Sequence, residues 1–261
     1  MAKYLEDWLD TDVAEAEKMS VGQLSNQFFF RDPTRPNYID YEHFYSPADG
    51  TILYQKVLED PSEPVVEIKG VNYTLQDVMC DKDYQKPSLV IGIFMSFYDV
   101  HINRIPYGGM LSYKPIDAIE STNKPMLATE KDIFNGKINP ANLEYLKYNE
   151  RMWNKIYSPS LDYTYYLIQI ADEDVNVISH FTNQQNDLFA QNERFSLIRW
   201  GSQVDLVLPL DNRYDFEFVL EDHMHVNAGL DKLVKINFKN YDNYKSWRWN
   251  LQRKKKTKKS N

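Results

Sequence analysis

The chain has 261 residues and a net charge of −8, and 43% of its residues are hydrophobic and 26% charged. This composition is typical of a globular protein with a sizeable core, and it excludes collagen, coiled coil and wholesale disorder. The longest apolar stretch, residues 88–98, is about half as long as a membrane-spanning helix. The acidic N-terminal segment has no apolar centre, so we expect no signal peptide. The single cysteine, Cys80, excludes a disulfide framework and a cysteine-based zinc site, and we expect a cytoplasmic protein.

The charge is unevenly distributed along the chain. Residues 1–244 carry −16 and residues 245–261 carry +8. The acidic body argues against broad nucleic-acid binding. The tail, residues 245–261, combines Trp247 and Trp249 with six basic residues in positions 253–259. Tryptophan favours the headgroup level and basic clusters are attracted to anionic lipid, so this tail predicts peripheral membrane contact. A solubilising disordered tail or a nucleic-acid contact are the alternatives.

Residues 1–44 are predicted to form an N-terminal helical extension followed by a loop. Four apolar residues recur at helical spacing: Ala14, Val21, Leu24 and Phe28. Asp10 or Thr11 would cap this helix, and the two prolines in residues 31–37 would end it.

Residues 45–244 read as one β-rich α+β domain. Short β-branched or aromatic segments alternate with Pro, Gly and Asp, which is typical of strands and turns. The predicted strands are residues 51–57, 65–68, 88–94, 100–105, 163–170, 195–200, 204–208 and 233–238. Residues 141–156 are predicted to form a helix.

The sequence contains no Gly-rich phosphate loop, no GxSxG motif and no HExxH motif. His223 and His225 would lie on one face of a strand, either as a metal-binding pair or at a solvated strand edge. The solvated edge is the favoured interpretation, because no third ligand has a recognisable spacing.

Three segments carry polar residues that suit chemistry. Asp49 lies in the turn of residues 46–50, and Asp-Gly turns are common. Asp99, His101 and Asn103 would share one strand face, which either lines a site or faces water.

The third segment places Gly201-Ser202 between two apolar strands. A glycine inside a strand pattern indicates a bulge or a close backbone approach. The serine beside it is either a nucleophile or simply part of the bulge.

Five motifs in order resemble the pyruvoyl-dependent phosphatidylserine decarboxylases, and most closely their short bacterial and archaeal type. They are FFRDPTR at 29–35, SPADG at 46–50, SFYDVHINR at 96–104, NER at 149–151 and ERFSLIRWGSQVD at 193–205. The resemblance implies antiparallel sheets around a Gly-Ser self-cleavage junction, and often a homodimer.

The resemblance also implies a mechanism. Ser202 would attack the carbonyl of Gly201, giving a β chain of residues 1–201 and an α chain that starts at position 202 with a pyruvoyl group. His101 would be the base and later the proton donor, and Asp49 would orient its imidazole. The pyruvoyl group would form a Schiff base with the substrate amine and accept electrons as CO₂ leaves. The family needs no pyridoxal phosphate and no metal.

The substrate implied by the resemblance is phosphatidylserine, converted to phosphatidylethanolamine. Where the family carries a glycine and paired arginines, this chain has the sequence DEDVNVI at residues 172–178. That departure keeps a free amino acid such as tryptophan as an alternative substrate, and a non-catalytic lipid- or protein-binding relative as an alternative function. Arg104, Arg151 and Arg199 would be the anion contacts, although we expect at least one of them to form a surface salt bridge instead.

Overall fold

The computed structural model describes residues 1–37, 39–119, 122–174 and 176–239. The predicted basic tail, residues 245–261, lies outside the described residues, so its expected membrane contact stays a prediction. Within the described residues, no helix is both long enough and apolar enough to cross a membrane.

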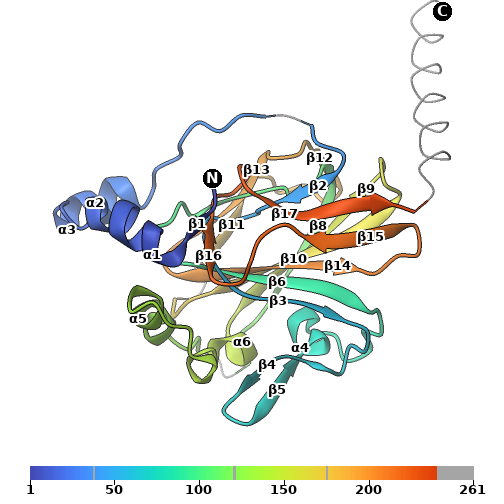
Figure 1. The fold of residues 1–261 in the computed structure, drawn as a ribbon, viewed down its shortest axis with the longest axis horizontal. Helices are drawn as coiled ribbons and strands as arrows, with labels where there is room; N and C mark the ends of the chain where they lie inside the picture. The colour runs from blue at the N-terminus through green and yellow to red at the C-terminus, as the bar shows by residue number, and fades with distance from the viewer. Residues whose placement is uncertain (38, 120–121, 175, 240–261) are drawn as a thin grey trace, which may run out of the picture.

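A nine-stranded antiparallel sheet runs through the middle of the described structure (Figure 1). Its strand order is β1-β16-β3-β6-β14-β10-β9-β8-β12. In that order the strands are Lys3–Tyr4, Met224–Val226, Gly50–Leu58, Ser88–Met95, Ser202–Pro209, Tyr163–Ala171, Arg151–Ser158, Gly109–Ile116 and Asp187–Phe189.

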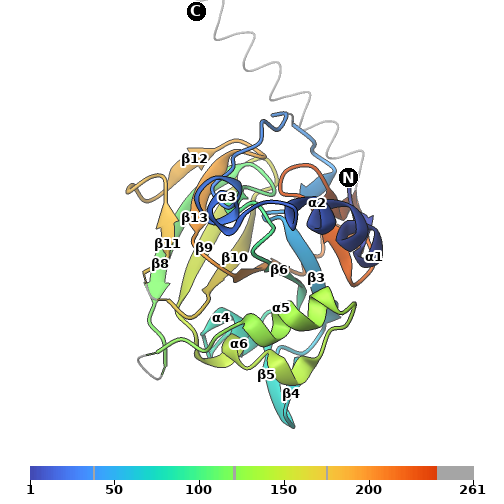
Figure 2. The ribbon, with the colours of Figure 1, turned by 90° about the vertical axis from the view of Figure 1, so that its left-hand side faces the viewer.

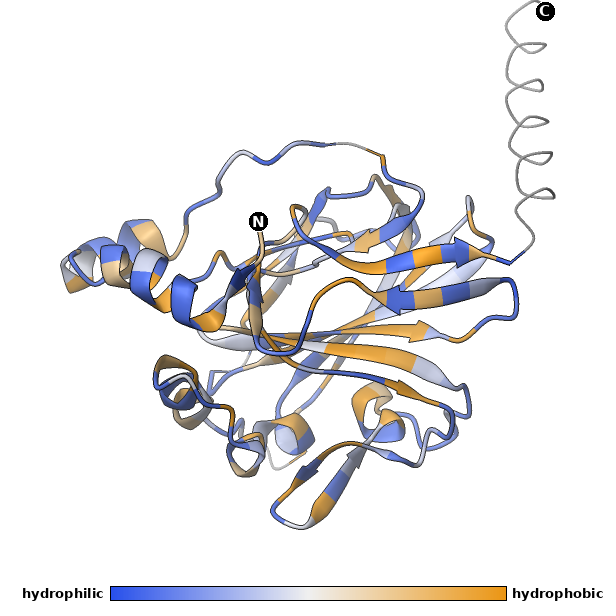
Figure 3. Ribbon diagram, viewed as in Figure 1, coloured by the Kyte–Doolittle hydropathy of each residue, from blue (hydrophilic) through white to orange (hydrophobic). Residues whose placement is uncertain are grey.

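The central strands β6 and β14 are buried along their whole length, because both faces of the sheet are covered. Figure 3 shows the resulting apolar band through the middle of the sheet. Successive side chains of a strand point to opposite faces. Ser202 therefore lies on the same face as Val204, Leu206 and Leu208, which belong to one core cluster, whereas Val207 belongs to a second cluster on the other face.

Two three-stranded sheets cover the face that carries Ser202. They have the orders β11-β13-β7 and β15-β17-β2. Their strands are Ile178–His180, Arg194–Ile198 and Ile102–Arg104 in the first sheet, and Tyr214–Phe218, Lys232–Phe238 and His43–Tyr45 in the second.

Short helices and a hairpin cover the opposite face, below the main sheet in Figures 1 and 2. The helices are α4 (Leu75–Met79), α5 (Leu127–Phe134), η3 (Pro140–Asn142) and α6 (Tyr145–Tyr148), and the hairpin joins β4 (Pro64–Ile68) to β5 (Val71–Thr74). Thr74 and Asp77 form a capping box that starts α4.

The N-terminal segment is helical, but it starts earlier than the sequence pattern predicts. Its helical turns are α1 (Leu5–Trp8), η1 (Leu9–Val13), α2 (Ala14–Ala16), α3 (Val21–Gln23) and η2 (Leu24–Phe28). The predicted cap at Asp10 or Thr11 is wrong, because both residues lie inside the helical run. The observed side-chain cap is Ser20, whose capping box with Gln23 starts the second helical stretch.

The β-rich fold class is confirmed, and the eight predicted strands overlap β3, β4, β6, β7, β10, β13, β14 and β17. The predicted helix over residues 141–156 is wrong in its second half. Residues 145–148 form α6, but Arg151–Ser158 form β9 between β8 and β10. Pairing with two neighbouring strands overrides the helical pattern of this segment.

Candidate active site

The Gly201-Ser202 dipeptide lies where three neighbouring strands end. Ser202 is the first residue of β14, and it pairs with Met95 at the end of β6 and with Ala171 at the end of β10. Its side chain is fully buried, and its Oγ lies 3.3 Å from the Sδ of Met95. The predicted interruption between two apolar strands is therefore present, with β13 ending at Ile198.

The backbone before Ser202 is unusual. Trp200 has a φ of 67°, in the left-handed region that a bulky residue rarely adopts. Gly201 makes the close approach that the sequence predicts, because a Cβ at this position would lie 2.7 Å from Oδ2 of Asp172. No residue with a side chain fits here without a shift of that carboxylate.

His101 lies at the same end of the sheet. Its backbone oxygen accepts a hydrogen bond from Ile198 N, just before the Gly201 turn. Its ring stacks on Phe29 at 4.2 Å between centroids, and Phe29 also contacts Trp200 at 5.5 Å. The FFRDP segment therefore packs His101 against the residues that precede Ser202.

The imidazole of His101 is anchored at one nitrogen and unpaired at the other. Its Nε2 lies 3.0 Å from the carbonyl oxygen of Ser96, whereas Nδ1 is buried with no hydrogen-bond partner. Burial lowers the pKa of His101 to about 4, so the ring is neutral near pH 7. In the described structure no hydrogen bond joins His101 to Ser202.

Asp49 is buried, and its carboxylate is bound by Arg35 rather than by His101. Both oxygens accept from the Arg35 guanidinium at 2.6 Å, and Oδ1 also accepts from Ala228 N at 2.7 Å. The orienting role expected for Asp49 stays a prediction. In this geometry Asp49 acts on His101 through its charge rather than through a hydrogen bond.

Asp99 shapes the turn that carries His101. It accepts from the N–H and the hydroxyl of Ser96, at 2.8 and 2.7 Å, and from His225 Nε2 at 2.6 Å. Burial alone would raise the pKa of Asp99, but His225 and the Ser96 donors hold it below its ordinary value. Asp99, His101 and Asn103 are all buried, so the water-facing alternative is excluded.

The pair His223 and His225 is neither a metal pair nor a solvated edge. His223 is exposed in a turn, whereas His225 is buried, stacks on Trp8 at 4.3 Å and binds Asp99. The described residues contain no group of three or more metal-ligating side chains. The sequence analysis missed this Asp99–His225 contact, because no local pattern links residues 126 positions apart.

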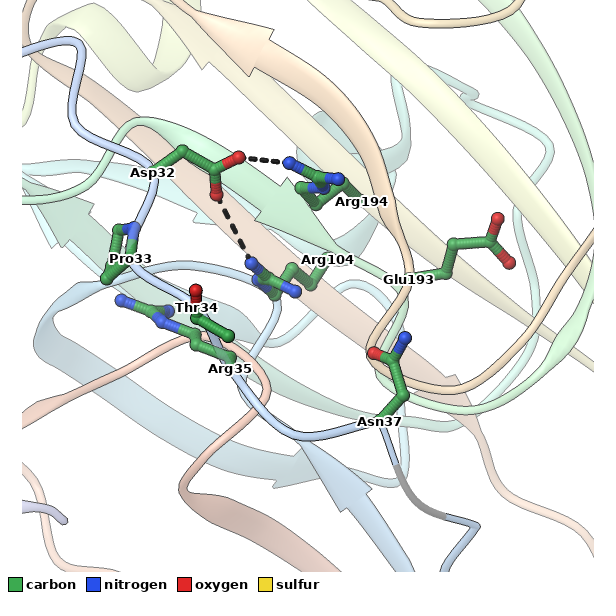
Figure 4. Close-up of a pocket in the computed structure, with 8 residues that line it drawn as sticks. All are labelled: Asp32, Pro33, Thr34, Arg35, Asn37, Arg104, Glu193 and Arg194. Carbon is green, nitrogen blue, oxygen red and sulfur yellow. Dashed lines mark hydrogen bonds and ion pairs between the residues drawn. The ribbon is translucent and has the colours of Figure 1, made fainter.

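The three candidate anion-binding arginines lie in different places. Arg104 lines a cavity of about 460 Å³ with Arg35 and Arg194 (Figure 4). Arg151 is buried on the helix-covered face, where it donates to the carbonyl oxygen of Leu146 at 2.6 Å. Arg199 is exposed in the turn before Trp200.

Figure 4 shows Asp32 between the guanidinium groups of Arg104 and Arg194, and it pairs with both. Nε of Arg104 is buried without a partner. Burial, followed by the charges of Arg35 and Arg194, lowers the pKa of Arg104, while the charges of Asp32 and Asp49 act in the opposite direction.

Comparison with known proteins shows the family of this chain. Residues 26–232 match the family model described as phosphatidylserine decarboxylase. The chain belongs to the phosphatidylserine decarboxylase family. The matched region includes Asp49, His101, Gly201 and Ser202.

Two curated relatives show the extent of the similarity. The phosphatidylserine decarboxylase proenzyme of Erythrobacter litoralis is 32% identical over 184 residues, which cover 69% of this chain and 62% of the relative. That of Prosthecochloris aestuarii is 27% identical over 217 residues, which cover 82% of this chain and 78% of the relative.

Replacing Asp99 with Asn should destabilise this decarboxylase-family chain by about 3 kcal/mol at pH 7, because it replaces a buried carboxylate that accepts hydrogen bonds from Ser96 and His225 with a neutral amide. The pKa of folded Asp99 is depressed, so its contribution is present above the ordinary aspartate pKa of about 3.9 and is lost as the pH falls below it. Urea unfolding at pH 7 and pH 3, in chains that also carry Ser202→Ala, measures both effects.

Asp10→Asn is the matched control for this measurement, because Asp10 is an exposed aspartate of the N-terminal helical segment. It should change the unfolding free energy by less than about 0.5 kcal/mol. Equal stabilities of Asp99→Asn and the parent at pH 7 would contradict the assigned role of Asp99.

Proposed function

We propose that this chain is a self-processing, pyruvoyl-dependent phosphatidylserine decarboxylase that cleaves itself between Gly201 and Ser202. The observation that carries the proposal is the placement of Ser202. It is a buried serine at the start of a central strand, preceded by a glycine that closely approaches the Asp172 carboxylate, and His101 lies at the same end of the sheet.

The roles of the residues follow from their chemistry. A serine hydroxyl needs a base that removes its proton before it attacks a carbonyl carbon. His101 suits that role, because its ring is neutral near pH 7 and its buried Nδ1 is unpaired. Asp49, held by Arg35, stabilises the positive charge that His101 would gain.

The surroundings of position 202 fit a pyruvoyl group. The position is fully buried, which excludes water, and His101, at the same end of the sheet, has an unpaired nitrogen that can hold or return a proton. When formed, a pyruvoyl carbonyl supplies the sink for the electron pair released as CO₂ leaves the substrate.

Intact mass under denaturing conditions tests the self-cleavage. We expect two chains split between residues 201 and 202, the C-terminal one about 17 Da lighter than a serine-initiated chain because it has lost ammonia. Ser202→Ala should give one uncleaved chain, and His101→Ala should slow cleavage by at least about a hundredfold through loss of the base. One uncleaved species from the parent chain at every pH tested would contradict the proposal and favour a non-catalytic binding relative.

Phosphatidylserine is the substrate that the site supports over a free amino acid. Its phosphodiester matches the guanidinium groups of Arg104 and Arg194, since arginine binds phosphate in a bidentate geometry. Arg35 lines the same cavity and binds Asp49, so this one side chain connects the arginine-lined cavity to Asp49. Arg151 and Arg199 lie outside this cavity lining.

Arg194→Gln and Arg104→Gln should each raise the KM for phosphatidylserine about tenfold and change kcat little, because they remove a binding charge that does not take part in bond breaking. Decarboxylation of dispersed short-chain phosphatidylserine measures both constants. Arg213→Gln, at an exposed arginine paired with Asp211, is the matched control. Faster turnover of free serine or tryptophan, or an unchanged KM in both variants, would contradict the assignment.

We also propose that the basic tail, residues 245–261, holds the enzyme at the membrane surface in the cytoplasm. The support is its two tryptophans and its net charge of +8. A homodimer stays a prediction from the family resemblance.

A chain that ends at residue 244 should have a higher KM on anionic vesicles and an unchanged KM on dispersed short-chain lipid. The reason is that each basic residue contributes about 1 kcal/mol only when an anionic surface is present. Equal vesicle binding of the full and shortened chains in a flotation assay would overturn the proposed role of the tail.

A further inference from the structure

Asp172 lies directly across from the proposed cleavage junction. Ser202 pairs with Ala171 in the register of β14 and β10, so the next residues, Gly201 and Asp172, also face each other. Because side chains alternate along a strand, this position belongs to the helix-covered face, opposite the face that carries the Ser202 hydroxyl.

The carboxylate of Asp172 is held in place against Gly201. Its Oδ1 accepts from Met126 N at 2.7 Å, at the start of α5, and from Glu173 N at 2.8 Å. Its Oδ2 is the atom that a Cβ at Gly201 would approach to 2.7 Å. A negative oxygen therefore rests against the residue whose carbonyl Ser202 would attack.

A second carboxylate, that of Glu130 on α5, flanks the same junction. Its Oε1 accepts from Phe97 N at 2.7 Å. Phe97 and Trp200 both contact the ring of Phe29, at 5.6 and 5.5 Å between centroids, so Glu130 binds the segment that packs beside the turn before Gly201.

The charged neighbours of these two groups are mostly acidic. Burial raises the pKa of Asp172 and of Glu130, and each feels further negative charges: Glu173 and Asp174 act on Asp172, and Asp172 and Asp99 act on Glu130. From the other packed elements, Tyr145 of α6 faces Asp172 and Tyr98 faces Glu130. Arg31 brings a positive charge to the turn of residues 96–99, where it donates to the carbonyl oxygens of Tyr98 and Asp99.

We propose that Asp172 and Glu130 form an acidic restraint that slows self-cleavage while they are ionised and releases it when they are protonated. This inference rests on the proposed function, and Asp172 and Glu130 act in it as positioning residues. The restraint acts on the first covalent step. The Ser202 Oγ–carbon bond forms, the Oγ proton passes to the base, and the electron pair of the carbonyl double bond moves to the Gly201 oxygen.

The negative charge on that oxygen is what the two carboxylates disfavour. The charge disappears when the carbon–nitrogen bond breaks and the nitrogen takes the proton, leaving an ester between residues 201 and 202. A like charge nearby raises the energy of an anion, so ionised Asp172 and Glu130 raise the barrier to this step.

The test is the rate of chain cleavage, followed by denaturing gel and intact mass after rapid purification, from pH 8 to pH 5. The full chain should cleave faster as the pH falls, because the raised pKa values of the two carboxylates favour their protonation while His101 stays neutral down to about pH 4. Asp172→Asn and Glu130→Gln, which keep the shape and an accepting oxygen, should each speed cleavage at pH 8 by about tenfold. Their double variant should lose the pH dependence.

Asp83→Asn is the matched control, because it removes one exposed carboxylate before the start of β6, at the end of that strand opposite Met95. It should cleave like the parent at each pH. Equal or slower cleavage of both neutralised variants at pH 8, in a parent chain that does cleave, would overturn the restraint and leave the proposed function intact. If the parent stays whole at pH 8 but cleaves at pH 5, and the double variant cleaves at pH 8, the restraint is supported; if neither cleaves at any pH, both proposals fail.

Discussion

The register of β14 between β6 and β10 is the constraint on which the rest of the site depends. Pairing on both sides fixes Ser202 at the shared end of three strands, and it fixes which face receives its hydroxyl. A slip by one residue would turn every side chain of β14 to the opposite face and bury polar groups in the apolar cluster. The same register places Gly201 across from Asp172, so one set of backbone hydrogen bonds positions both the nucleophile and the carboxylate behind it.

Buried carboxylates with bound partners hold the loops around this strand end. Asp49 is bound by Arg35, and Asp99 is bound by His225 and by Ser96, whose carbonyl oxygen holds His101. Buried charges are costly unless they are paired, so each pair strongly favours the one loop arrangement that completes it. The N-terminal segment also contributes to this end of the sheet, because Trp8 stacks on His225 and Phe29 stacks on His101.

Opposite charges lie on different sides of the site. The arginines of the cavity in Figure 4 gather around the loop of residues 32–37, whereas Asp172 and Glu130 lie on the helix-covered face beside the junction. The two carboxylates also lie beside the peptide bond that would break, so the proposed restraint links self-cleavage of the chain to the protonation of Asp172 and Glu130.

The sequence by itself determined the β-rich class, the eight strands and the motifs that contain Asp49, His101, Gly201 and Ser202, because alternation of side chains and short contiguous motifs are local properties. It misassigned residues 151–156 as helix, since only pairing with β8 and β10 makes that segment a strand. It could not reveal that Asp49 binds Arg35, that Asp99 binds His225, or that Asp172 faces Gly201. Those partners are distant along the chain, and only the tertiary structure decided them, because strand register and the pairing of buried charges depend on contacts that no local pattern encodes.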